Sequence, residues 1–152
     1  MRNFLFAVLL VVTSISFAQD RPVLFGGVGA SFSSFDNTGV YFQAGVNTVK
    51  AGDFQISTIA ALQIMQETRT LNLNVIPTFD IYDTNDVEFQ LGAGATFMKA
   101  TRTFPESTTS FEMGAVVRGV VQLQDQDLFF YAENAIVSNG YDYLSLGVGF
   151  NF

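Results

Sequence analysis

The chain has 152 residues, of which 14 are acidic and 7 basic, and its formal net charge is −7 at pH 7. This acidic balance argues against nucleic acid as a partner, because binding to phosphates requires clustered Lys and Arg. Cys and His are both absent, so the sequence offers no disulfide framework, no thiol nucleophile and no imidazole for metal binding or general base catalysis. We therefore expect no cofactor, no metal site and no catalytic residue.

The first 18 residues have the pattern of a secretory signal peptide. Arg2 supplies a positive start, an unbroken apolar run covers 4–12, and Ser16 and Ala18 are the small residues that a cleavage site requires. The run is much shorter than the roughly 20 residues of a transmembrane helix; an uncleaved anchor is the alternative. We expect residues 1–18 to be removed and residues 19–152 to form a single domain.

Eight later segments alternate between apolar and polar residues. They cover 24–32, 40–46, 54–64, 71–81, 87–97, 111–123, 128–136 and 144–152. The positions between the apolar ones carry mostly Gln, Asn, Ser, Thr, Tyr and Gly. This period of two predicts β-strands with two chemically different faces, and no stretch shows a convincing helical period.

The links between these segments are mostly short and rich in Gly, Asn and Asp, as at 36–39, 83–86 and 138–140. Such residues favour tight hairpins, and links this short leave no room for a crossover, so neighbouring strands should run antiparallel. The predicted fold is all-β, an eight-stranded antiparallel up-and-down β-barrel. One longer link is expected at 99–110. Pro77 predicts a bulge or a locally open hydrogen bond, since proline cannot donate to a strand ladder.

Alternation alone does not say which face meets water. A soluble ligand-binding barrel would have the apolar face inside, whereas a transmembrane barrel has it outside. An up-and-down order places two groups of Phe at opposite ends of the apolar face, which predicts the two aromatic girdles of a transmembrane barrel. The outer group is Phe32, Phe42, Phe97 and Phe111, and the inner group is Phe54, Phe79, Phe89, Phe130, Phe150 and Phe152.

The last segment alternates apolar residues from Leu144 to Phe152 with small or polar ones, and the sequence ends on Phe152. This ending, the signal peptide and the eight alternating segments resemble the small eight-stranded outer-membrane β-barrels of the OmpA and OmpX kind. The resemblance implies location in the outer membrane of a Gram-negative cell, in contact with its lipid and lipopolysaccharide. It also implies that the terminal strand, with Tyr143, Phe150 and Phe152, is the signal read by the barrel-assembly machinery.

Charged residues also occur on the polar face, among them Glu112, Arg118 and Glu133. A tight turn at 125–127 would place Arg118 opposite Glu133 in adjacent strands, so an interior ion pair is expected, with Glu112 on the same face. The functional interpretation of this group is a gate or an ion path. The structural alternative is a plug, because an unpaired Arg in a narrow lumen would be strongly unfavourable.

Lys99, Arg102 and Phe104 are candidates for contacts outside the cell. The two cations, together with Arg69, would meet lipopolysaccharide phosphates as charge-assisted pairs. Phe104 lies in a stretch rich in Thr and Ser that would form an adhesive tip. An ordinary solvated loop is the alternative for this stretch.

Barrel enzymes that act as proteases or lipid A deacylases rely on His, which this chain lacks. Lipid acyltransfer is harder to exclude, but no pair of the Ser/His kind supports it. We therefore predict a monomeric, non-enzymatic outer-membrane protein with a structural, surface-interaction or adhesive role. The rival interpretation is a narrow pore or transporter for small ions or small apolar molecules, although eight strands enclose a space just wide enough for their own side chains or one small ligand.

Overall fold

The computed structural model describes residues 23–33, 38–51, 53–102 and 107–152. The signal peptide predicted at 1–18 and the candidate contact Phe104 lie outside the described residues. Eight strands form: β1 (Val23–Ser33), β2 (Thr38–Ala51), β3 (Phe54–Met65), β4 (Thr68–Asp83), β5 (Val87–Arg102), β6 (Thr108–Leu123), β7 (Leu128–Val137) and β8 (Tyr143–Asn151). Two short 3-10 turns, η2 (Gln124–Gln126) and η3 (Ser138–Gly140), precede β7 and β8. The described residues contain no helix with the length and apolar character that a membrane crossing requires.

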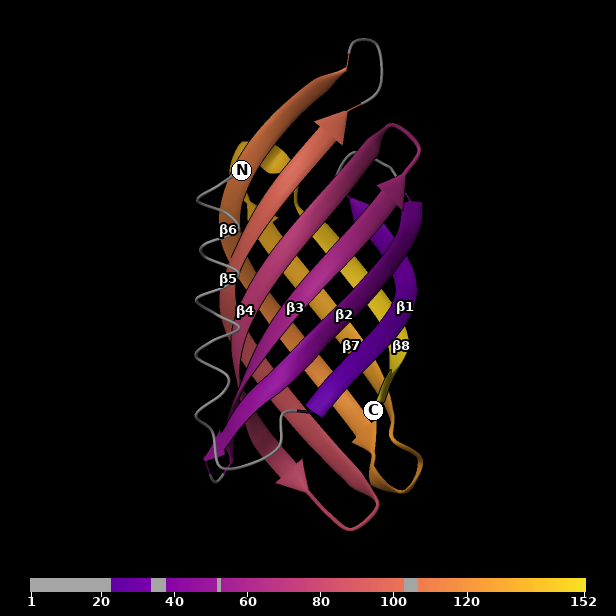
Figure 1. Cartoon of the computed structure of the whole chain (residues 1–152), viewed down its shortest axis with the longest axis vertical. Helices are drawn as coiled ribbons and strands as arrows, with labels where there is room; N and C mark the ends of the chain where they lie inside the picture. The colour runs from indigo at the N-terminus through magenta and orange to yellow at the C-terminus, as the bar shows by residue number, and fades with distance from the viewer. Residues whose placement is uncertain (1–22, 34–37, 52, 103–106) are drawn as a thin grey trace.

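The strands close into one antiparallel barrel in chain order (Figure 1). Each strand pairs with the next, and β8 completes the ring by pairing with β1 from Asn151 to Tyr143. The predicted all-β, eight-stranded antiparallel barrel is therefore confirmed. Closure pairs β1 with β8, which removes the edges that an open sheet would expose to lipid.

The two ends of the barrel carry different links (Figure 1). The β3–β4 and β5–β6 links lie at one end, which we call the outer end. The β4–β5 and β6–β7 links lie at the opposite, inner end together with the end of β8. The β6–β7 turn closes at Asp127, whose φ of 51° is left-handed, a conformation that Asp tolerates better than most residues.

Side chains alternate between the lumen and the outer face of the barrel. In β7, Phe129, Tyr131 and Glu133 are buried, whereas Phe130 and Ile136 are exposed. All eight strands expose large apolar side chains outward. Of the Phe residues predicted to form girdles, Phe54 is half-buried, and the exposed ones are Phe32, Phe42, Phe79, Phe89, Phe97, Phe111, Phe130, Phe150 and Phe152. The apolar face is thus outside, which contradicts the alternative of a soluble barrel with an apolar lumen.

The lumen contains more apolar side chains than the alternation suggests. Phe25, Ile59 and Phe129 are buried inside the barrel among the polar residues. Glycines on β8 make room for the rings that β7 sends inward. A Cβ at Gly149 would lie 2.3 Å from the ring of Phe129, and one at Gly147 would lie 2.4 Å from the hydroxyl of Tyr131. The rings of Phe129 and Tyr131 therefore fill this side of the lumen by packing directly over the two glycines.

The long link expected at 99–110 is shorter than predicted. β5 continues to Arg102, β6 begins at Thr108, and the two strands remain paired up to these residues. β7, by contrast, pairs with β6 only from Gly114 onward. The outer parts of β5 and β6 therefore form a hairpin that projects beyond the rest of the outer end (Figure 1).

Pro77 lies in β4 without a bulge. The ladder to β3 is continuous past it. In the ladder to β5, Pro77 and the residue before it are not paired. Pairing stops at Val75 and resumes at Thr78, and the register is the same on both sides of this gap. Of the two expected outcomes, the locally open bond is the one present. The register shift comes later, between Asp80 and Tyr82.

Candidate functional site

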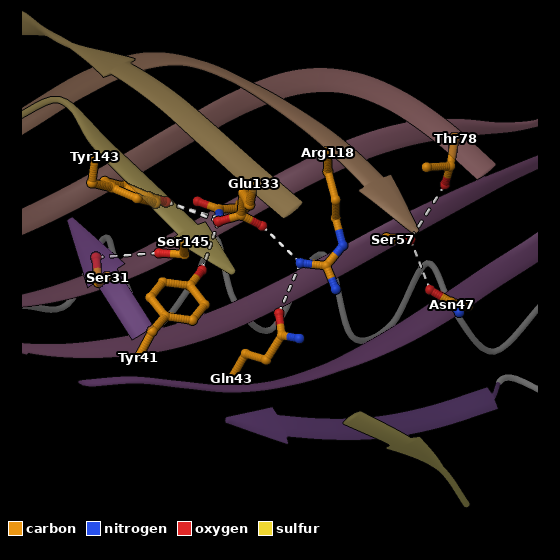
Figure 2. A network of polar contacts seen from close by, with 11 residues as sticks. Ser31, Tyr41, Gln43, Asn47, Ser57, Thr78, Arg118, Glu133, Tyr143 and Ser145 are labelled. Atoms are coloured by element: carbon orange, nitrogen blue, oxygen red, sulfur yellow. Dashed lines mark hydrogen bonds and ion pairs between the residues drawn. The ribbon is translucent and has the colours of Figure 1, made fainter. Parts of the chain in front are cut away.

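Arg118 of β6 and Glu133 of β7 form an ion pair inside the barrel (Figure 2). The turn at η2 brings the two strands together so that these residues lie directly opposite each other. Arg118 Nη1 is 2.8 Å from Glu133 Oε2, and only 3% and 0% of the two side chains are exposed. The structure thus places the two charges where the sequence predicts them. Removal of either residue would leave the charge of the other buried and unpaired.

Three more donors converge on the second carboxylate oxygen of Glu133 (Figure 2). Oε1 accepts hydrogen bonds from Tyr41 Oη at 2.6 Å, from Asn74 Nδ2 at 2.8 Å and from Tyr143 Oη at 2.9 Å. These donors stand on β2, β4 and β8, so one carboxylate connects strands around the whole barrel. We call the five residues Tyr41, Asn74, Arg118, Glu133 and Tyr143 the central layer.

Arg118 is held by neutral groups as well as by Glu133. Its Nη1 also donates to Gln43 Oε1 at 2.8 Å. Its guanidinium carbon lies 4.7 Å from the centroid of the Tyr131 ring and 5.9 Å from that of Phe25. Aromatic faces attract a weakly hydrated guanidinium, especially where water is excluded. Contacts from β1, β2 and β7 therefore fix this cation.

The central layer is buried inside the barrel. Tyr41, Asn74 and Glu133 have no exposed surface, and Arg118 and Tyr143 are each 2% exposed. These five side chains therefore have almost no contact with solvent. This packed arrangement is what the structural plug requires, and the choice between a plug and a gate or ion path stays a prediction.

Other polar side chains fill the lumen on either side of the central layer. Toward the outer end, Gln63 Nε2 donates to Ser31 Oγ. Toward the inner end, Gln55 Nε2 donates to Gln90 Oε1 at 2.8 Å, and Gln90 Nε2 donates to Glu88 Oε1 at 2.7 Å. The lumen is therefore occupied by side chains that bond to one another, as expected for so narrow a barrel.

A small pocket reaches Arg118 from the inner half of the barrel. Its volume is about 20 Å³, which is enough for roughly one water molecule. It is too small for any larger ligand. The lining residues are Phe25, Asn47, Ser57, Gln90, Arg118, Val120, Gln122, Phe129 and Asn151.

Four polar atoms on the β4–β5 wall are buried without a hydrogen-bond partner among the described residues. They are both amide atoms of Asn72, Oδ1 of Asn74 and Oγ1 of Thr96. Asn74 and Thr96 lie directly opposite each other, and Asn72 shares their face. Buried polar groups of this kind are commonly satisfied by ordered water. Side chains thus leave this wall incompletely bonded, and the same holds for Gln43 Nε2 and the Tyr131 hydroxyl on other strands.

Glu112 does not belong to the central layer. It shares a face of β6 with Arg118, but the two residues are six positions apart, which is about 20 Å along a strand. Glu112 Oε2 accepts a hydrogen bond from Ser138 Oγ at 2.7 Å. The structure therefore places Glu112 beside the β7–β8 link at the outer end.

The predicted outer contacts stand on a strand. Lys99 points outward from β5 and is exposed. Arg102, at the end of β5, lies 3.6 Å from Glu67 Oε2 through its Nη2, and about half of each side chain is exposed. Their role as contacts stays a prediction.

The three residues of the predicted assembly signal face two different ways. Tyr143 points into the lumen and belongs to the central layer. Phe150 and Phe152 point outward and are 51% and 84% exposed. Their recognition by an assembly machinery stays a prediction.

Sequence reasoning did not foresee that Tyr41, Asn74 and Tyr143 meet at one carboxylate. Alternation along the strand does indicate which face Tyr41 shares. Tyr41 lies two residues before Gln43, so both side chains are on the same face of β2. What was missing is the offset between strands that face each other across the lumen. No group of three or more His, Cys, Asp or Glu within the described ranges is placed to hold a metal ion.

No family model and no curated protein matches the chain. Solved structures with the same fold do exist. Neisserial surface protein A (NspA) has a TM-score of 0.67 at 14% identity, over 86% of this chain and 94% of that one. The N-terminal β-barrel domain of Pseudomonas aeruginosa OprF has a TM-score of 0.65 at 12% identity, over 86% of this chain and 97% of that one.

The outer membrane enzyme PagL is also similar, with a TM-score of 0.54 at 9% identity over 86% of this chain and 98% of that one. Identities this low relate the folds alone, and the relatives include both an enzyme and a surface protein. The closed ring, its apolar exterior and these matches agree. The chain is a small eight-stranded transmembrane β-barrel with the fold of outer-membrane proteins such as NspA and OprF, as the resemblance in its sequence predicts.

Proposed function

We propose that this chain is a non-enzymatic integral outer-membrane protein that acts at the cell surface through its outer end, with a closed lumen that stabilises the barrel. The observation that carries this proposal is the central layer, because its buried and mutually bonded side chains occupy the place that a transport path would need. The proposal includes export by a cleaved signal peptide, folding by the barrel-assembly machinery and a monomeric state.

The outer face supports insertion into a membrane. It exposes apolar side chains on every strand, including Leu146 in β8 at 46% and Val117 in β6 at 50%. A soluble monomer rarely exposes a continuous apolar band of this kind. In a bilayer the same band is the favourable surface, and the exposed Phe rings suit its interfaces.

The outer end supports a role at the surface. The β5–β6 hairpin reaches past β7, whose last residue is Val137. Within the described residues it carries Lys99, Arg102 and Thr108–Ser110, and most of these are exposed. NspA is by its name a surface protein. A projecting hairpin on a closed barrel offers contact area without a passage through the membrane.

The absence of His from the whole sequence supports a non-enzymatic role. PagL is described as an enzyme and shares the fold, so fold alone does not decide the question. Acyl transfer and hydrolysis in such a barrel would require an activated nucleophile with an adjacent base. The site described above contains one carboxylate that is already engaged by four donors.

The alternative is a narrow pore. Its support is the inner pocket, which brings about one water's volume of space up to Arg118. The test is single-channel conductance in a planar bilayer, with protein first shown to be folded by its gel mobility before and after boiling. We expect no discrete conductance steps from the folded, inserted wild-type protein. Steps from the wild type would overturn the closed-lumen proposal and support the pore.

A further inference from the structure

Two cations stand next to each other on the outward face near the outer end. Arg69 of β4 lies opposite Thr101 of β5, and Leu71 of β4 lies opposite Lys99 of β5. Arg69 and Lys99 are therefore diagonal neighbours on one face, at which distance (about 7–8 Å) long side chains can reach a common ligand. Both are exposed.

Neither cation forms an ion pair with a carboxylate of the described residues. Arg102 differs, because Glu67 lies 3.6 Å from it. Glu67 thus balances the charge at the tip of β5, while the charges of Arg69 and Lys99 are unbalanced by any described residue. Within residues 23–33, 38–51, 53–102 and 107–152, no carboxylate competes with an outside partner for this pair of positive charges.

The register fixes how deep Lys99 lies. Its neighbour in β6 is Phe111, one of the exposed outer Phe residues, and its neighbour in β4 is Leu71. Lys99 is therefore embedded in the outer rim of the apolar band. A cation at this level of a transmembrane barrel extends its side chain to the polar headgroups, where its cost is smallest.

We propose that Arg69 and Lys99 bind a phosphate group of a lipid in the outer leaflet of the membrane. This inference rests on the proposed function, since it requires an inserted barrel in the stated orientation. A guanidinium binds phosphate through two parallel hydrogen bonds, and a lysine ammonium adds a point charge. Phe111 and Leu71 beside Lys99 would contact the acyl chains of the same lipid.

The inner end carries the opposite charge. Its turns expose Asp53, Asp83, Asp86, Asp125 and Asp127. An anionic headgroup is therefore repelled at the inner rim and attracted at the outer one. This asymmetry favours a site at Arg69 and Lys99 over unspecific attraction of lipid around the whole barrel.

The test measures binding of diphosphorylated lipid A to folded protein in a neutral detergent by native mass spectrometry. We compare the wild type with Arg69→Gln/Lys99→Gln. The two lysines of the sequence give a matched control, because Lys50 lies near the inner end of β2. Lys50→Gln removes the same charge as Lys99→Gln at the opposite rim.

We expect the double variant to bind diphosphorylated lipid A about tenfold more weakly or worse, and Lys50→Gln to bind like the wild type. Dephosphorylated lipid A should bind the wild type no better than the double variant does, and inorganic phosphate should not compete. Equal binding by the double variant and the wild type would overturn the proposal, as would effective competition by inorganic phosphate. Conductance from the same folded protein would instead overturn the proposed function alone.

Discussion

The cations of this barrel occur in two contrasting environments. Arg118 is inside, almost without exposed surface, and is held by Glu133, Gln43 and an aromatic ring. Arg69 and Lys99 are outside and exposed, with no ion pair to a described residue. The contrast shows that the interior charge is part of the folded structure, whereas the outer charges depend on what surrounds the barrel. Changes inside should therefore alter stability, and changes at the rim should alter binding.

The largest effect is expected from removal of Glu133. Glu133→Ala leaves Arg118 buried without its counter-charge and leaves three further donors without their acceptor. We expect the free energy of unfolding to fall by about 3–5 kcal/mol. The measurement is denaturant unfolding of the barrel in lipid vesicles, followed by far-ultraviolet circular dichroism.

Arg118→Met provides the matched comparison. It also breaks the ion pair, but the carboxylate of Glu133 keeps Tyr41, Asn74 and Tyr143 as donors. The loss should therefore be smaller than for Glu133→Ala. Equal losses would show that the three neutral donors contribute nothing, and wild-type stability of both variants would contradict the account of the central layer.

The second comparison uses two glycines on opposite faces of the sheet. A Cβ at Gly147 would lie 2.4 Å from both the Tyr131 hydroxyl and the carbonyl oxygen of Val28, whereas a Cβ at Gly119 would meet nothing within 4 Å. We expect Gly147→Val to cost about 1–3 kcal/mol through overpacking. Gly119→Val should be neutral or stabilising, because Val favours strands and faces outward.

The measurement is the unfolding midpoint of each glycine variant in the same vesicles, which shows whether the filled lumen causes the loss of stability. If Gly119→Val were as harmful as Gly147→Val, the cost would come from the backbone of the strands and not from the filled lumen. A tolerated Gly147→Val would mean that both the Tyr131 ring and the backbone at Val28 can move away from this position.

Much of the architecture is predictable from local pattern. The period of two is written in each strand, because one face meets lipid and the other the lumen. The pairing of Arg118 with Glu133 is predictable too, since a tight turn near Asp127 fixes the register of β6 and β7. Both inferences depend only on residues that are neighbours along the chain or across one hairpin.

The rest depends on relations that local pattern does not contain. Tyr41 reaches Glu133 from a strand that is not its neighbour in the sheet, so their meeting depends on the tilt and stagger of the closed barrel. Residue type also misleads. Phe129 reads as lipid-facing by its chemistry, yet it shares the parity of Glu133 and is buried. Once one residue of a strand is known to face the lumen, counting every second position from it predicts the interior residues better than residue type does.

The smallest effect is expected when single hydroxyl groups are removed from the lumen, one that forms a hydrogen bond and one that does not. Tyr143 is 2% exposed and its hydroxyl donates to Glu133 Oε1 at 2.9 Å, while Thr96 is fully buried and its hydroxyl has no described partner. Tyr143→Phe removes a hydrogen bond to a charged acceptor and should cost about 1–2 kcal/mol. Thr96→Val removes a hydroxyl that bonds to no side chain and should change stability by less than about 0.5 kcal/mol.

Both substitutions keep the shape of the side chain, so the same unfolding measurement compares the hydroxyl groups alone. A cost for Thr96→Val as large as that for Tyr143→Phe would mean that ordered water bonds Thr96 to Asn72 or Asn74, since these carry the other unpartnered atoms of that wall. A neutral Tyr143→Phe would instead show that Tyr41, Asn74 and Arg118 satisfy Glu133 without it. In that case the central layer would depend on its packing and its ion pair more than on the number of its hydrogen bonds.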